Sequence, residues 1–154
     1  MDLPEIIRKP RKPAYRKPEA VRELERLANE AARKKYPLFN PAHLAPRIFR
    51  DDKANSLTSC VVTYITLKGG FASRINSTGV YNQKLRKYIP GTQKKGIADI
   101  ISTYRGKSLQ IEVKIGRDVQ SDSQKKIQKE QEASGGLYFL ARNFTDFKFW
   151  FDSL

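Results

Sequence analysis

The sequence predicts an α/β fold in which a central mixed sheet of four strands is flanked by helices on both faces. Residues 97–104 are rich in β-branched and aromatic side chains, and residues 108–115 alternate strictly between apolar and polar. Arg105-Gly106-Lys107 between the two runs is a turn signal, so the runs are expected to pair as an antiparallel hairpin. Segments with helical character lie before and after this hairpin.

Three parts are expected along the chain. Residues 1–18 combine four prolines with six basic residues between Arg8 and Lys17, which is typical of an extended or disordered basic arm. Residues 19–50 are expected to form one helix that ends near Lys35, followed by a proline-rich connecting loop. Residues 51–154 are expected to form the main domain.

In the main domain, a cap at Asp51 or Asp52 predicts a helix that continues to about Lys68, where Gly69-Gly70 ends it. The apolar residues of this segment recur at helical spacing and are expected to form its buried face: Leu57, Cys60, Val61, Tyr64 and Ile65. Residues 71–77 are expected to form the first strand, at or near an edge of the sheet.

Beyond the hairpin, Ser121 or Ser123 is expected to cap a helix that ends near Ser134. A strand at 137–142 and a closing helix at 145–152 follow. The closing helix carries a cluster of aromatic residues that are expected to be core or interface residues: Phe144, Phe147, Trp150 and Phe151. Their apolar surface exceeds what one short helix needs, which favours a homodimer.

The composition points to a polyanionic partner. The 154 residues carry a net charge of +14 and an isoelectric point near 10.0, which is most often a sign of nucleic-acid binding. No long apolar run or strongly amphipathic anchor favours a membrane. The single cysteine, Cys60, excludes an internal disulfide, and with no apolar signal segment it favours an intracellular, cytoplasmic protein.

Two carboxylates stand out in a basic region. Between Lys53 and Arg117 the chain has twelve basic residues, and its only acidic residues are Asp99 and Glu112. If Arg105 and Gly106 form the hairpin loop, Asp99 lies directly across from Glu112, with side chains about 5 Å apart. Two like charges at that distance require a metal ion, a shared proton or a nearby cation. An ordinary half-buried strand is the alternative for residues 111–115 taken alone.

The order Gly96-Ile97-Ala98-Asp99, then Ile111-Glu112-Val113-Lys114, then a helix that opens with Gln124 resembles the PD-(D/E)xK nuclease superfamily. It is most similar to the VRR-type branch, which is itself similar to phage and archaeal Holliday junction resolvase-like endonucleases. The resemblance covers residues 55–149. It implies a restriction-endonuclease-like core for residues 51–154, in a bacterial or phage-infected cell.

The resemblance also implies a divalent-metal-dependent endonuclease that hydrolyses DNA, with Mg²⁺ or Mn²⁺ as cofactor. Asp99 and Glu112 would hold the metal with the Val113 carbonyl, Lys114 would act on the attacking water or the developing charge, and Gln124 would lie beside the metal. The family often has a glutamate at the start of the preceding helix as a third ligand. Asn55 stands near that place here and is expected to ligate through its amide oxygen.

Basic and polar residues near these motifs are expected to contact the nucleic acid: Arg74, Asn76, Ser77, Lys84, Arg86, Lys87, Lys94, Lys95, Arg117 and Lys125. The resemblance also implies branched or junction DNA as a possible substrate, and symmetric branched substrates favour a twofold dimer; the sequence itself leaves branched, nicked, flapped and linear DNA open. Two alternatives stay open on the sequence: a non-catalytic DNA-binding module of nuclease fold, and a nuclease that acts on RNA.

Overall fold

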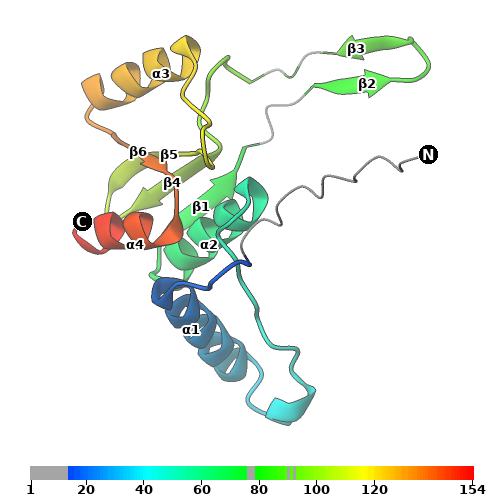
Figure 1. The fold of residues 1–154 in the computed structure, drawn as a ribbon, viewed down its shortest axis with the longest axis vertical. Helices are drawn as coiled ribbons and strands as arrows, with labels where there is room; N and C mark the ends of the chain where they lie inside the picture. The colour runs from blue at the N-terminus through cyan, green and yellow to red at the C-terminus, as the bar shows by residue number, and fades with distance from the viewer. Residues whose placement is uncertain (1–13, 76–78, 90, 92) are drawn as a thin grey trace, which may run out of the picture.

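The computed structural model describes residues 14–75, 79–89, 91 and 93–154 (Figure 1). It confirms an α/β fold with a four-stranded mixed sheet in the order β1-β4-β5-β6. Neighbouring strands are antiparallel except β5 and β6, which are parallel. The strands of this sheet are β1 (Phe71–Arg74), β4 (Ile100–Tyr104), β5 (Lys107–Val113) and β6 (Leu137–Ala141). The helices are α1 (Glu19–Lys35), α2 (Ala54–Leu67), α3 (Asp122–Ala133) and α4 (Phe144–Asp152).

The predicted central hairpin is confirmed in its register. Tyr104 pairs with Lys107 and Ile100 pairs with Ile111, so the loop consists of Arg105 and Gly106. Both loop residues have left-handed backbone angles, with φ of 48° and 75°. That is the geometry of a type I′ turn, whose twist matches that of the two strands it joins. The strict alternation of β5 therefore places its apolar residues on one face of the sheet and its polar residues on the other.

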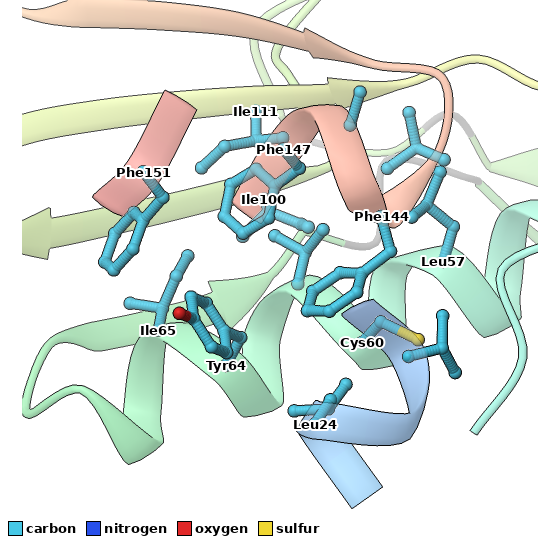
Figure 2. Close-up of a cluster of buried hydrophobic side chains, with 14 of the residues drawn as sticks. Leu24, Leu57, Cys60, Tyr64, Ile65, Ile100, Ile111, Phe144, Phe147 and Phe151 are labelled. Carbon is cyan, nitrogen blue, oxygen red and sulfur yellow. The ribbon is translucent and has the colours of Figure 1, made fainter. Parts of the chain in front are cut away.

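The apolar face of the sheet packs against α2 and α4 (Figure 2). Ile100 and Ile111 of the sheet are fully buried there together with the predicted face of α2. Burial raises the pKa of the Cys60 thiol to about 12, so this cysteine fills space in the core and has no thiolate character. Val21 and Leu24 of α1 belong to the same core, so the N-terminal helix and the sheet share it.

The aromatic residues of α4 belong to the core. Phe144, Phe147 and Phe151 are fully buried, and Trp150 stacks on Phe139 of β6 at 4.5 Å between ring centroids. The expectation that this cluster offers surplus apolar surface for a dimer is therefore wrong. Phe149, which points to solvent from the same helix, is the exposed aromatic residue of α4.

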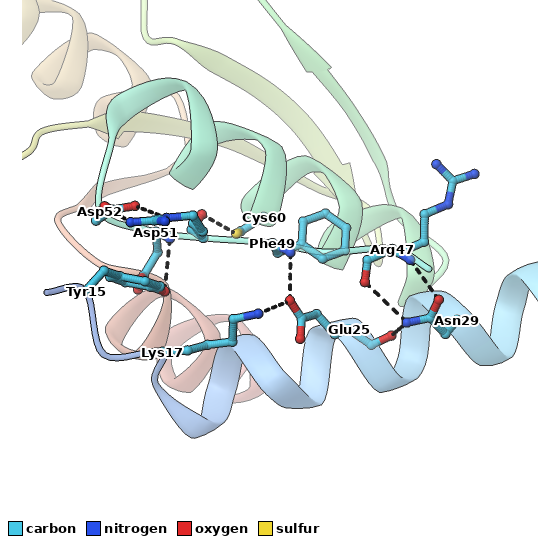
Figure 3. Close-up of polar contacts among 10 residues, drawn as sticks. Tyr15, Lys17, Glu25, Asn29, Arg47, Phe49, Asp51, Asp52 and Cys60 are labelled. Atoms are coloured by element: carbon cyan, nitrogen blue, oxygen red, sulfur yellow. Dashed lines mark hydrogen bonds and ion pairs between the residues drawn. The ribbon is translucent and has the colours of Figure 1, made fainter. Parts of the chain in front are cut away.

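A polar network fixes α1 to the chain segment that precedes α2 (Figure 3). Glu25 accepts a hydrogen bond from the backbone N–H of Phe49 at 2.8 Å, and Asn29 accepts one from that of Arg47 at 2.8 Å. Lys17 donates to Glu25 on the other side. The connecting loop predicted here is confirmed, apart from one short 3₁₀ turn, η1 (Pro41–His43).

Neither Asp51 nor Asp52 caps α2, contrary to the sequence prediction. The helix begins after Lys53, and no described side chain caps its first turn. Asp51 is buried and accepts hydrogen bonds from the Tyr15 hydroxyl at 2.8 Å and from the backbone N–H of Phe144 at 3.1 Å. It thus stabilises the N-terminus of α4, where a negative charge also complements the helix dipole. Asp52 pairs with Arg50 in solvent.

This difference predicts unequal effects at two adjacent aspartates. Asp51→Ala leaves the Phe144 N–H buried without its acceptor, so we expect the free energy of unfolding to fall by about 2–3 kcal/mol. Asp52→Ala breaks only an exposed ion pair and should cost less than about 1 kcal/mol. Urea denaturation of the two variants measures the difference. Equal losses would contradict the role of Asp51 at α4.

A second, two-stranded sheet was not predicted. The basic segment after β1 folds into an antiparallel hairpin of β2 (Val80–Asn82) and β3 (Lys87–Ile89). Figure 1 shows this hairpin extending away from the body of the molecule, beyond the end of β1.

Candidate functional site

Asp99 and Glu112 lie opposite each other on the polar face of the sheet. Ile100 of β4 pairs with Ile111 of β5, so in this antiparallel register the next residues along the two strands, Asp99 and Glu112, lie opposite each other. The Asp99 carboxylate accepts a hydrogen bond from the backbone N–H of Val113 at 2.9 Å. The carboxylate thereby continues the hydrogen bonding of the two strands by one residue and is held against β5.

Glu112 is the most enclosed charged residue of this face, with 2% of its surface exposed. Its Oε1 accepts a hydrogen bond from Gln124 Nε2 and lies 3.2 Å from Lys114 Nζ. Its Oε2 is buried without a hydrogen-bond partner among the described residues. Burial, and after it the negative charge of Asp99, raises the pKa of Glu112 to about 7 in spite of the nearby Lys114.

Lys114 is 8% exposed and lies between two carboxylates. Its Nζ is 3.2 Å from Glu112 Oε1 and 3.6 Å from Asp118 Oδ2. A buried ammonium is stable only where acidic partners compensate for its lost hydration. The three polar side chains Asp99, Glu112 and Lys114 therefore form one charged group beneath α3.

Helix α3 covers this face of the sheet and presents Gln124 to it (Figure 1). Ser121 caps α3, as predicted, in a reciprocal arrangement in which Ser121 accepts from the backbone of Gln124 and Gln124 Oε1 accepts from the backbone of Ser121. The same Gln124 amide donates through Nε2 to Glu112. One side chain thus fixes the start of the helix and one oxygen of the buried carboxylate. Further along α3, Gln131 accepts from Gln110 at 3.0 Å.

Gly96 brings the chain close to the start of α3. Its φ is +84°, and a Cβ placed there would lie 2.5 Å from the backbone carbon and oxygen of Ser123. Only glycine allows this approach without displacement of either segment. The glycine of Gly96-Ile97-Ala98-Asp99 therefore sets the distance between the segment that delivers Asp99 and the helix that delivers Gln124.

Three residues of this region were missed by the sequence analysis. Asp118 pairs with Lys114 as described, and Gln120 donates to Gln128 at 3.1 Å and to the Tyr138 hydroxyl at 3.4 Å. Burial raises the pKa of Tyr138 to about 12, with smaller contributions from the charges of Glu112 and Asp99. Tyr138 pairs with Gln110 and so shares the face of Glu112. Residues 137–141 are apolar or aromatic throughout, and no alternation in them marks Tyr138.

The structure does not bring Asn55 into contact with the carboxylate pair. Its amide oxygen accepts a hydrogen bond from Arg74 Nη2 at 2.7 Å. Arg74 pairs with Ile100, a residue of the apolar face, whereas Asp99 and Glu112 lie on the polar face. Asn55 as a metal ligand stays a prediction, and the positive charge of Arg74 on its amide oxygen would weaken a cation there.

The residues expected to contact nucleic acid fall into three groups. Asn76 and Ser77 lie outside the described residues, and Lys84, Arg86 and Lys87 are exposed on the β2–β3 hairpin. The remaining cations are all exposed: Arg74, Lys94, Lys95, Arg117 and Lys125. Two of these have acidic partners on α3, since Lys94 pairs with Glu130 and Lys125 lies 3.6 Å from Asp122.

The donor set of the site fits a hard divalent cation. Carboxylate and backbone carbonyl oxygens are the ligands that Mg²⁺ and Mn²⁺ prefer, and the buried Oε2 of Glu112 is an oxygen that has no partner within the described chain. A positive ion there would also relieve the repulsion between Asp99 and Glu112. The described residues contain no group of three or more histidines, cysteines, aspartates or glutamates placed to hold a metal. Two carboxylates are therefore the acidic part of this donor set.

Comparison with known proteins gives no match among family models, curated proteins or solved structures. In the described part of the chain, no helix is both long enough and apolar enough to cross a bilayer.

Proposed function

We propose that this protein is a divalent-metal-dependent endonuclease that hydrolyses phosphodiester bonds of DNA on a restriction-endonuclease-like core. The observation that carries the proposal is the group of Asp99, Glu112 and Lys114, in which a buried carboxylate keeps one oxygen without a partner among the described residues. Burying such an oxygen without a partner costs free energy, and a bound cation would compensate for that cost.

In this proposal Asp99 and Glu112 hold Mg²⁺ or Mn²⁺, with the Val113 carbonyl as a further ligand. The bound ion supplies a water of lowered pKa and neutralises charge on the phosphate. The chain supplies the rest. Val113 N–H orients the Asp99 carboxylate, and Gln124 orients that of Glu112, so both ligands are fixed before any ion arrives.

Lys114 is assigned to the reacting phosphate. Its ammonium would orient the attacking water or stabilise the negative charge that develops on the phosphate oxygens. Low exposure strengthens either effect, because electrostatic interactions increase where water is excluded. Asp118 holds the same ammonium from the solvent side and keeps the side chain close to Glu112.

DNA as the partner is supported by charge. The chain carries +14, and the cations near the site, Lys95 and Arg117 among them, are exposed on the same molecule. Branched DNA as the preferred form is part of the proposal, and the four-way junction in the substrate assay tests it. A twofold dimer that would present two sites to such DNA is tested by light scattering of the protein with the junction bound.

The test is a cleavage assay with purified protein on four labelled substrates: linear duplex, nicked duplex, four-way junction and single-stranded RNA. Each is incubated with Mg²⁺, Mn²⁺ or a chelator. We expect metal-dependent cleavage of DNA, abolished by the chelator, and at least about a hundredfold loss in Lys114→Met, which removes one charged group from the transition state. Cleavage that persists in chelator would overturn the proposal, and cleavage of RNA alone would reassign the substrate.

A non-catalytic DNA-binding module is the second candidate, favoured by one observation. Asn55, the expected third ligand, gives its amide oxygen to Arg74. A site with two carboxylates binds a divalent ion more weakly than one with three. Isothermal titration calorimetry of the wild type with Mn²⁺, in the absence of DNA, separates the two candidates. A saturable site that is lost in Asp99→Asn supports the enzyme. No binding in the millimolar range supports the non-catalytic module. A raised midpoint in Asn55→Ala would establish Asn55 as a ligand.

A further inference from the structure

The β2–β3 hairpin is an exposed two-stranded ribbon. Tyr81 pairs with Tyr88 across the two strands, so both tyrosines lie on one face of the ribbon, and they are 58% and 61% exposed. The loop, residues 83–86, is fully on the surface, and Asn82 stabilises it by accepting a hydrogen bond from the backbone N–H of Leu85 at 3.1 Å. A lone two-stranded ribbon is marginally stable in water, so a surface that binds it would add to its order.

The segment that contains the hairpin is inserted between two residues beside the candidate site. β1 and β4 are paired strands, and the hairpin is inserted between Arg74, the end of β1, and Ile100, the start of β4. The backbone N–H of Ile75 donates to the carbonyl of Asp99 at 2.7 Å. Both connections therefore leave the sheet next to Asp99. A nucleic acid bound at the carboxylate pair would extend past the base of the ribbon.

The charge of the ribbon has one sign. Lys84, Arg86 and Lys87 lie at its tip and are all exposed, and the sequence contains no aspartate or glutamate between residues 54 and 98. These three cations have no acidic neighbour along their own segment to neutralise them. A phosphate backbone is the complement of such a surface.

We propose that the β2–β3 hairpin is a DNA-binding arm that lies in the major groove of the duplex beside the cleavage site, with Lys84, Arg86 and Lys87 against phosphates. The major groove is about 12 Å wide and admits a two-stranded ribbon. This inference rests on the proposed function for the position of the duplex. It adds a second contact region that holds duplex DNA independently of the metal site.

The test measures binding without cleavage. A fluorescent 30-base-pair duplex and the matching single strand are titrated in chelator at several salt concentrations. The triple variant Lys84→Ala, Arg86→Ala, Lys87→Ala is compared with a control triple at the far end of α1, Arg33→Ala, Lys34→Ala, Lys35→Ala, which loses the same charge from exposed positions. Unchanged melting temperatures establish that both variants are folded.

We expect the hairpin triple to lower the slope of log K against log salt by about 2.7, since each phosphate contact contributes about 0.9. It should weaken duplex binding at least about tenfold in 0.1 M salt, whereas the control should change the slope by less than about 1. Methylation of guanine N7, which lies in the major groove, should be blocked by the wild type near the cleavage site and restored in the hairpin triple.

Three results would each overturn the proposed DNA-binding arm. The two triple variants could lose equal duplex affinity, the hairpin triple could lose more affinity for the single strand than for the duplex, or it could retain the protection of guanine N7. The outcome is separable from that of the proposed function, because cleavage is measured in parallel with Mg²⁺. Hairpin-dependent binding without cleavage would keep the arm and reject the nuclease. Cleavage with unaltered binding in the hairpin triple would keep the nuclease and reject the arm.

Discussion

Asp99→Asn is expected to reduce DNA cleavage at least about a thousandfold, or roughly 4 kcal/mol of transition-state stabilisation, because a metal ligand worth several kcal/mol is lost. The amide can still accept the hydrogen bond from Val113 N–H, so the fold should be preserved. Duplex binding in chelator should be unchanged or tighter, since one negative charge near the phosphates is removed. Single-turnover cleavage and fluorescence anisotropy measure the two effects separately.

The control for this substitution is Asp122→Asn, which makes the same chemical change on the exposed first turn of α3, where Lys125 is the one ion-pair partner of the carboxylate among the described residues. Glu112→Gln provides a second loss of charge in the site and should match Asp99→Asn in cleavage. If either site variant retained cleavage within tenfold of the wild type, the metal assignment would be wrong. If Asp122→Asn lost as much cleavage activity as the two site variants, the loss would reflect the change in net charge alone.

How far the fold follows from the sequence is clearest in the central hairpin. The turn Arg105-Gly106 fixes the register, and the register alone places Asp99 opposite Glu112, as the structure has it. The alternation of residues 108–115 likewise predicted which side chains share a face, but it did not predict that Glu112 and Lys114 are buried on the polar face. Such features are local, because turn chemistry and a period of two act within a few residues.

The failures involve distant residues. Asp51 stands where a cap of the next helix is expected, but its carboxylate accepts a hydrogen bond from the backbone N–H of Phe144, 93 residues further along the chain. The aromatic residues of the closing helix suggested a dimer interface, because a short helix cannot bury them alone. They are buried instead in a core that includes Tyr64 of α2 and Ile100 of β4. The β2–β3 ribbon escaped prediction because each of its strands is only three residues long and the segment between them is basic and polar. Propensity gives little signal over so short a run.

The site shows the same division. The sequence singled out Asp99, Glu112 and Lys114 by their order and spacing and Gln124 through the family resemblance, and the structure confirms Ser121 as the cap of the helix that carries Gln124. Tyr138 joins them only through the pairing of β5 with β6, which no local spacing records, whereas Asp118 is four residues from Lys114 and was overlooked in a segment that was interpreted as a strand break. Asn55 differs again, since its neighbour Arg74 comes from the paired edge strand and decides what its amide oxygen binds.

Gly96→Ala is expected to lower the free energy of unfolding by about 3 kcal/mol and to reduce cleavage as well. A left-handed backbone costs an alanine about 1 kcal/mol, and the new Cβ, 2.5 Å from the Ser123 backbone, adds an overpacking cost of about 1–3 kcal/mol. Neighbouring backbone cannot rotate away as a side chain can. The start of α3 must therefore move, and Gln124 moves with it away from Glu112.

Gly106→Ala is the matched control, because Gly106 has a similar φ of +75° and no described atom lies within 4 Å of its added Cβ. It should cost about 1 kcal/mol, the backbone penalty alone, and leave cleavage near the wild-type rate. Urea denaturation and single-turnover cleavage of the two variants therefore separate backbone strain from displacement of α3. Equal stability losses at the two glycines would show that the contact between Gly96 and Ser123 is not tight. A destabilised Gly96→Ala that cleaved at full rate would mean that α3 does not position Gln124 for the reaction.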